Sequence, residues 1–68
     1  MSEEKPYITL QQALKKYDLI DSGGHAKLVI QQGEVTVDGV VEVRRGRKLY
    51  GGEVIVYQLK TATVGDVN

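Results

Sequence analysis

The sequence predicts a small α+β domain in which two helices pack on an antiparallel sheet of three or more strands. Two observations lead to this prediction: apolar residues recur at helical spacing before Gly33, and they alternate with polar residues after it. Two turn signals, Asp38-Gly39 and Gly51-Gly52, divide the second half into segments of strand length. The 68 residues suffice for one such domain and are too few for two separate cores.

The first helix is predicted over about residues 9–17. Its apolar residues have the i, i+3, i+4, i+7 spacing of one helix face: Leu10, Ala13, Leu14 and Tyr17. Thr9 is expected to cap the first turn, and Gln12 stands where a capping box requires it. Lys15 and Lys16 are expected on the solvent-exposed face.

The second helix is predicted over about residues 24–32. Its apolar positions are Ala26, Val29 and Ile30. Either Asp21 or Ser22 is expected to cap its first turn. Gly33 suits the left-handed backbone position that ends many helices.

Beyond this glycine the apolar period changes to two, which predicts strands. Val35 and Val37 share one side of the first strand, while Val41 and Val43 alternate with Glu42 in the second. The Asp-Gly pair between them tolerates the positive φ angles of a tight two-residue turn. We therefore predict a β-hairpin over residues 34–43.

The domain itself is predicted to span residues 8–60, after a polar N-terminal segment of residues 1–7. A third strand is predicted over Glu53–Lys60, because the segment is rich in β-branched and aromatic residues. Residues 61–68 either add a short edge strand or form a tail.

Composition narrows the function classes. The chain contains no Cys and one His, His25, so the sequence predicts no metal site, no cofactor and no disulfide. No apolar stretch approaches the roughly 20 residues that cross a bilayer, and the start is acidic, so we expect a cytoplasmic protein without a membrane partner. No paired carboxylates, activated nucleophile or cofactor fingerprint indicates an enzyme.

Positive charge is concentrated at four of the five positions from Arg44 to Lys48, although the whole chain has a formal net charge of zero. The four cationic residues are Arg44, Arg45, Arg47 and Lys48. Such a run is often a solvated loop. Like charges repel one another, however, so we expect the fold to gain nothing from crowding them, whereas a polyanion would release counterions on binding them. We interpret the run as one localised phosphate-binding patch.

A second candidate site is the expected start of the second helix. The backbone N–H groups at Ser22, Gly23 and Gly24 could hold a phosphate, because the two glycines have no Cβ atoms to obstruct it. Lys27 follows one turn further on. The alternative is an ordinary capped turn, because Ser before a helix is common for stability alone. The spacing is not that of a P-loop.

The segment Ser22–Ile55 resembles the S4 RNA-binding domain family, in particular its small stand-alone members. The matching features are the Ser-led helix start, Ala26-Lys27, Gly33, the Val-x-Val-Asp-Gly hairpin, the run Arg44–Leu49 and Gly52-Glu53-Val54. The resemblance implies a compact α+β fold that binds structured RNA across a helix face and neighbouring loops. Many members carry Arg where this chain has Thr9 and Gly23, so its positive charge is concentrated in the basic run instead.

We therefore predict a non-catalytic protein that binds structured RNA, with ribosomal and transfer RNA as the candidate ligands. The alternative is a protein-interaction module that docks its basic loop on an acidic ribosomal or assembly-factor partner. His25 is interpreted as a bystander or an auxiliary contact. Tyr50 either stacks on a base or packs at the sheet margin, and with four Tyr and no Phe or Trp a stacking platform is not indicated.

Overall fold

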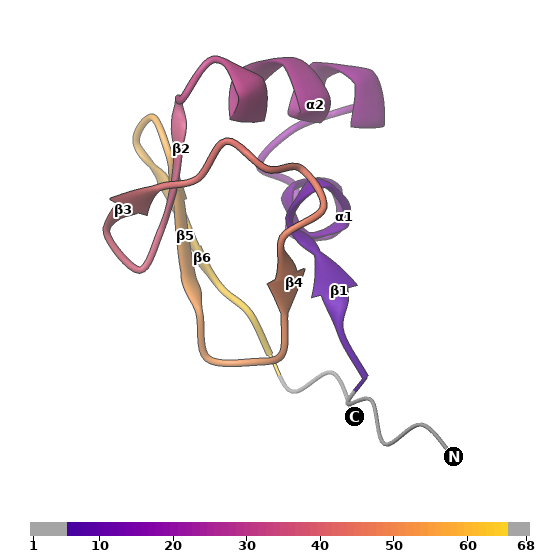
Figure 1. Cartoon of the computed structure of the whole chain (residues 1–68), viewed down its shortest axis with the longest axis vertical. Coiled ribbons are helices and arrows are strands. Elements are labelled where there is room, and N and C mark those ends of the chain that lie inside the picture. The colour runs from indigo at the N-terminus through magenta and orange to yellow at the C-terminus, as the bar shows by residue number, and fades with distance from the viewer. Residues whose placement is uncertain (1–5, 66–68) are drawn as a thin grey trace.

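The computed structural model describes residues 6–65 and has two helices on a four-stranded antiparallel sheet, with a separate two-stranded ribbon (Figure 1). This is the α+β architecture that the sequence predicted. The helices are α1 (Leu10–Lys16) and α2 (Gly23–Gln31). The strands are β1 (Ile8–Thr9), β2 (Val35–Val37), β3 (Val40–Val41), β4 (Lys48–Leu49), β5 (Val54–Tyr57) and β6 (Lys60–Thr63). Residues 1–5 and 66–68, which belong to the predicted terminal segments, lie outside the described residues.

Both helices begin with the caps that local chemistry predicted. Oγ1 of Thr9 accepts from the N–H of Gln12 at 3.2 Å, and the Gln12 side chain accepts from the N–H of Thr9 at 3.0 Å, which completes a capping box. Ser22, rather than Asp21, caps α2, and the helix starts and ends one residue earlier than predicted. Gly33 follows it with φ of 79°, as expected for a helix-ending glycine.

The main sheet has the strand order β3-β2-β5-β6, with all neighbours antiparallel. The hairpin between β2 and β3 turns at Asp38 and Gly39, whose φ angles of 53° and 83° suit the mirror-image turn that matches strand twist. The third predicted strand, β5, ends at Tyr57 and not at Lys60, because the chain reverses at Gln58, where φ is 56°. The segment that follows pairs with β5 as the edge strand β6.

The ribbon of β1 and β4 was not predicted. Its register pairs Ile8 with Leu49 and Thr9 with Lys48, and β1 runs directly into α1. Strands of two residues carry too little alternation to be recognised in a sequence, and their partner lies about forty positions away.

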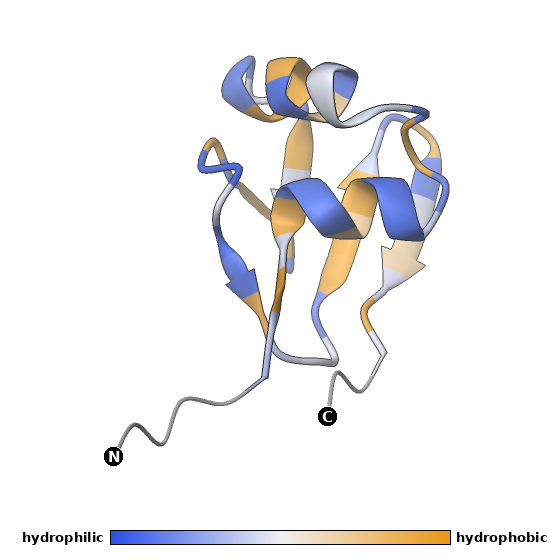
Figure 2. Cartoon of the chain, turned by 90° about the vertical axis from the view of Figure 1, so that its right-hand side faces the viewer, coloured by the Kyte–Doolittle hydropathy of each residue, from blue (hydrophilic) through white to orange (hydrophobic). Residues whose placement is uncertain are grey.

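The core lies between the sheet, α1 and α2. In Figures 1 and 2, α1 crosses one face of the sheet on the side of the ribbon, and α2 lies across one end. Fully buried side chains come from every layer: Leu10, Leu14, Ile30, Val35, Leu49 and Ile55 are each 0% exposed. Within residues 6–65, no helix is long and apolar enough to cross a membrane.

Burial in the second half of the hairpin is the reverse of what hydrophobicity alone would give. Val41 and Val43 are 56% and 53% exposed, whereas the intervening Glu42 is buried. β3 ends at Val41, so the strand pattern does not continue, and the glutamate side chain turns inward to meet two arginines.

Candidate nucleic-acid interface

The basic loop, defined here as Arg44–Lys48, connects β3 to β4 and passes over the N-terminal end of α1 (Figure 1). The N–H of Leu10 donates to the carbonyl of Arg47 at 2.9 Å, and the N–H of Gln11 donates to the carbonyl of Arg45 at 3.1 Å. The first N–H groups of a helix have no acceptor within it, so the loop supplies the acceptors that α1 needs. The backbone of the basic loop is therefore fixed by α1.

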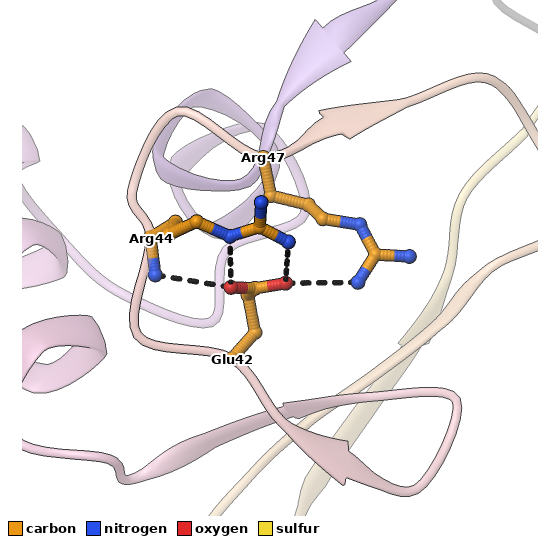
Figure 3. Close-up of polar contacts among 3 residues, drawn as sticks. All are labelled: Glu42, Arg44 and Arg47. Atoms are coloured by element: carbon orange, nitrogen blue, oxygen red, sulfur yellow. Dashed lines mark hydrogen bonds and ion pairs between the residues drawn. The ribbon is translucent and has the colours of Figure 1, made fainter.

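A buried carboxylate, Glu42, binds two arginines of the loop (Figure 3). Its Oε2 accepts from Nε of Arg44 at 2.9 Å and from the backbone N–H of the same residue at 3.1 Å. Its Oε1 accepts from Nη2 of Arg44 at 3.2 Å and from Nη1 of Arg47 at 2.9 Å. Because each carboxylate oxygen accepts two hydrogen bonds, the two guanidinium groups are fixed relative to each other.

The electrostatics of this cluster favour the fully charged state. Hydrogen bonds from Arg44 and then from Arg47 lower the pKa of Glu42 from 4.5 to about 2, although burial acts in the opposite direction. The same contact raises the pKa of Arg44. The four cationic side chains of the basic loop and the carboxylate of Glu42 together carry three net positive charges.

The expectation that the fold gains nothing from the crowded cations is wrong for Arg44 and Arg47. Both stabilise the buried carboxylate of Glu42, which would otherwise be costly to desolvate. The expectation still describes Arg45, whose exposed side chain makes no hydrogen bond or ion pair within residues 6–65. Lys48 places Nζ 5.0 Å from the centre of the Tyr7 ring.

Arg44 and Arg47 remain exposed to solvent although both are bound to Glu42. The side chain of Arg44 is 74% exposed and that of Arg47 is 34% exposed, compared with 8% for Glu42. An open hollow in the surface is lined by Arg44, Gly46, Arg47 and Lys48. Three of the four predicted cationic residues therefore line one hollow, and Arg45 is not among its lining residues.

The predicted second site, the start of α2, has the geometry of a capped helix. Oγ of Ser22 accepts from the N–H of His25 at 3.2 Å. A Cβ added at Gly24 would meet nothing within 4 Å, so this turn is open to a ligand. Lys27 lies one turn further along α2, and its side chain is exposed.

Gln11 brings the two predicted sites together. Its backbone N–H binds the carbonyl of Arg45 in the basic loop, and its Nε2 donates to the carbonyl of Gly23 at 2.8 Å. One residue thus contacts both the loop and the first turn of α2. By contrast, Lys15 and Lys16 lie in the last turn of α1, at the other end of that helix.

Three residues that organise this surface were missed by the sequence prediction. Glu42 was described only as part of the alternation in the hairpin, and Gln11 was assigned no role. Glu53 accepts from the N–H groups of Tyr50 at 2.9 Å and Gly51 at 2.8 Å. Although burial acts to raise the pKa of Glu53, these hydrogen bonds hold it below its usual value. For Glu42, the only signal in the sequence was its position two residues before the Arg44-Arg45 pair, where a carboxylate can bind a guanidinium.

Comparison with known proteins agrees with this architecture. The sequence matches the S4 domain family over residues 1–65. It is 47% identical over 55 residues to a probable ribosome maturation protein, RlbA, of Bacillus subtilis, an alignment that covers 81% of this chain and 78% of the relative. It is 36% identical over 52 residues to a putative RNA-binding protein, YbcJ, of Escherichia coli, covering 76% of this chain and 74% of the relative.

The family match covers nearly the whole chain, and it includes both helices, the sheet, the ribbon and the basic loop. No cluster of three or more potential metal-ligating side chains occurs among residues 6–65. The chain belongs to the S4 domain family.

Proposed function

We propose that the chain is a non-catalytic RNA-binding protein that recognises structured RNA through the basic loop and the first turn of α2. The observation that carries the proposal is the contact between Glu42 and its two arginines. A buried carboxylate orients cationic groups whose remaining donors face solvent. Membership of the S4 domain family and the name of the Escherichia coli relative support RNA as the ligand.

The hydrogen-bond inventory of the arginines supports phosphate binding. A guanidinium has five N–H donors, and Arg44 uses only two of them, from Nε and Nη2, on Glu42. Arg47 uses one. The unused N–H groups can donate to two phosphate oxygens in the forked geometry that Lys cannot provide. Because the carboxylate already fixes the side chains, binding loses less rotamer entropy than it would with mobile arginines.

The start of α2 extends this surface in the proposal. Its first N–H groups and the helix dipole favour an anion, and Gly24 leaves room for a phosphate oxygen to approach the backbone. Lys27 adds a positive charge on the exposed side of the helix. A localised patch of this kind fits the phosphates of a folded or duplex RNA, which proteins recognise largely by shape.

The proposed role is binding without catalysis, because the patch presents cationic side chains and backbone donors. A second candidate is a protein-interaction module that docks the basic loop on an acidic partner in ribosome or ribonucleoprotein assembly. The name of the Bacillus subtilis relative, a probable ribosome maturation protein, supports a partner of this kind. Both candidates use the same charges, so the ligand itself must distinguish them.

The test is the salt dependence of affinity for an RNA hairpin. Arg45→Gln/Lys48→Gln removes two cations and leaves both arginines on Glu42. If each contacts one phosphate, the slope of log affinity against log salt should become less steep by about 1.4 to 1.8. Lys15→Gln/Lys16→Gln makes the same charge change at the far end of α1 and should alter the slope less.

An unchanged slope in the loop variant, or a larger change in the α1 variant, would contradict the proposed site. Crosslinking in cells separates the two candidates. Recovery of RNA above background supports RNA binding, whereas recovery of an acidic protein without RNA supports the interaction module.

A further inference from the structure

Two exposed tyrosines lie side by side next to the basic loop. In the antiparallel ribbon, Ile8 pairs with Leu49, so the preceding Tyr7 and the following Tyr50 lie opposite each other. Their ring centroids are 6.3 Å apart at an interplanar angle of 63°. Leu49 is fully buried, and side chains alternate along a strand, so the ribbon points its tyrosines away from the core.

These tyrosines differ from the other two in the chain. The hydroxyl of Tyr17 accepts from the N–H of Gly65 at 2.9 Å, and Tyr57 is 7% exposed. Tyr7 and Tyr50 are each 44% exposed, and neither hydroxyl makes a hydrogen bond within residues 6–65. Because the rings meet edge to face, the contact covers at most one of their faces, and aromatic surface stays accessible.

The pair is also held in place. The carboxylate of Glu53 accepts from the N–H of Tyr50 at 2.9 Å, which fixes the backbone where the ribbon ends. Nζ of Lys48 lies 5.0 Å from the centre of the Tyr7 ring and covers part of it, so Tyr50 offers the more open face.

We propose that Tyr7 and Tyr50 form a stacking platform for one unpaired RNA base at the edge of the basic loop. This inference rests on the proposed function. Lys48 belongs to both the loop and the aromatic cluster, so a nucleotide with its phosphate on the loop can place its base on the rings. Stacking on aromatic side chains tolerates any base, because every base has a π face. The ligand is therefore an unpaired nucleotide adjoining a duplex.

The experiment compares two RNA hairpins whose stems are closed by the same non-nucleotide linker, so that neither has an unpaired base in its loop. The open end of one stem is blunt, and the open end of the other carries a single unpaired 2-aminopurine. Each stacked base should strengthen binding roughly 5- to 150-fold, so the wild-type protein should prefer the second RNA by a factor in that range. Binding should also quench the 2-aminopurine fluorescence.

Tyr7→Leu/Tyr50→Leu keeps apolar volume on the ribbon and removes the aromatic faces. This variant should bind both hairpins with the affinity that the wild type has for the blunt one, with an unchanged salt slope. Tyr7→Phe/Tyr50→Phe should retain the preference and the quenching, because stacking needs the ring and not the hydroxyl.

Equal wild-type affinity for the two hairpins would overturn the platform while leaving the proposed function intact. The platform is also overturned if the Leu variant loses affinity for both hairpins equally while the Phe variant does not, since the rings would then act only on the fold. If the wild type bound neither hairpin, the proposed function would fail, and the platform with it.

Discussion

Nη1 of Arg47 lies 2.9 Å from Oε1 of Glu42, so a side chain near the end of the basic loop contacts a buried carboxylate two positions before the loop begins. Arg44 binds the same carboxylate from the other side of the turn. One negative charge thus holds together two arginines from opposite ends of the loop. This explains how a chain of zero net charge can keep a cationic surface in a defined shape.

Replacing that carboxylate should weaken RNA binding, although it adds net positive charge. Glu42→Gln removes the negative charge and replaces one of the two acceptor oxygens that orient the arginines with an NH2 donor, so we expect lower affinity and a loss of unfolding free energy of about 1 to 3 kcal/mol. Glu34→Gln makes the same charge change at a more exposed site and should leave affinity equal or slightly higher. Fluorescence anisotropy with an RNA hairpin measures the affinities. Higher affinity in Glu42→Gln would show that net charge matters more than orientation.

Stability should fall in acid through the same residue. The folded-state pKa of Glu42, about 2, is below its ordinary value of 4.5. Its stabilising contribution is therefore fully present above about pH 4.5 and is lost as the pH falls toward 2. In urea denaturation, the stability difference between wild type and Glu42→Gln should stay constant from about pH 6 to about pH 4.5 and then shrink as the pH falls to about 2.5. A difference that did not vary with pH would exclude this assignment.

The open turn at the start of α2 offers a separate test of phosphate binding. Gly24→Asp places a carboxylate where the helix dipole favours it, so the fold should keep its stability while RNA affinity falls. Gly24→Ala is the matched control, because its Cβ meets nothing within 4 Å. The Ala variant should bind RNA as the wild type does. Wild-type affinity in the Asp variant would remove this turn from the site.

The cap of the same helix should contribute to stability. Ser22→Ala removes the acceptor of the His25 N–H and should lower the unfolding free energy by about 1 kcal/mol. Asp21→Ala, at the neighbouring exposed position, should change it much less. Denaturant midpoints measure both changes. The reverse order would identify Asp21 as the cap in solution.

Features set by neighbours in the sequence were predictable. The capping box of Thr9 and Gln12, the Ser22 cap and the turn at Asp38-Gly39 each follow from the chemistry of a few adjacent residues. The burial of Leu10, Leu14 and Ile30 followed from helical spacing. These features were enough to predict the α+β class and the position of the basic loop.

Features that join distant segments were not predictable. The ribbon of β1 and β4, the bond from Gln11 to Gly23 and the inward turn of Glu42 all depend on where the chain returns in space. For Glu42, alternation with Val41 and Val43 did not indicate which side is buried, because the arginines that bind its carboxylate meet it only through the path of the loop. The organisation of the candidate site, as opposed to its composition, therefore required the structure.

The carbonyls of Arg45 and Arg47 that accept from the first turn of α1 also affect folding cooperativity. A surface loop that opened independently would expose the amides of Leu10 and Gln11 to hydrogen exchange at the rate of a local fluctuation. Here the loop cannot leave without removing acceptors from a helix whose Leu10 is fully buried. We therefore expect the loop to open together with the first turn of α1, so that the amides of Leu10 and Gln11 exchange more slowly than those of an independent surface loop.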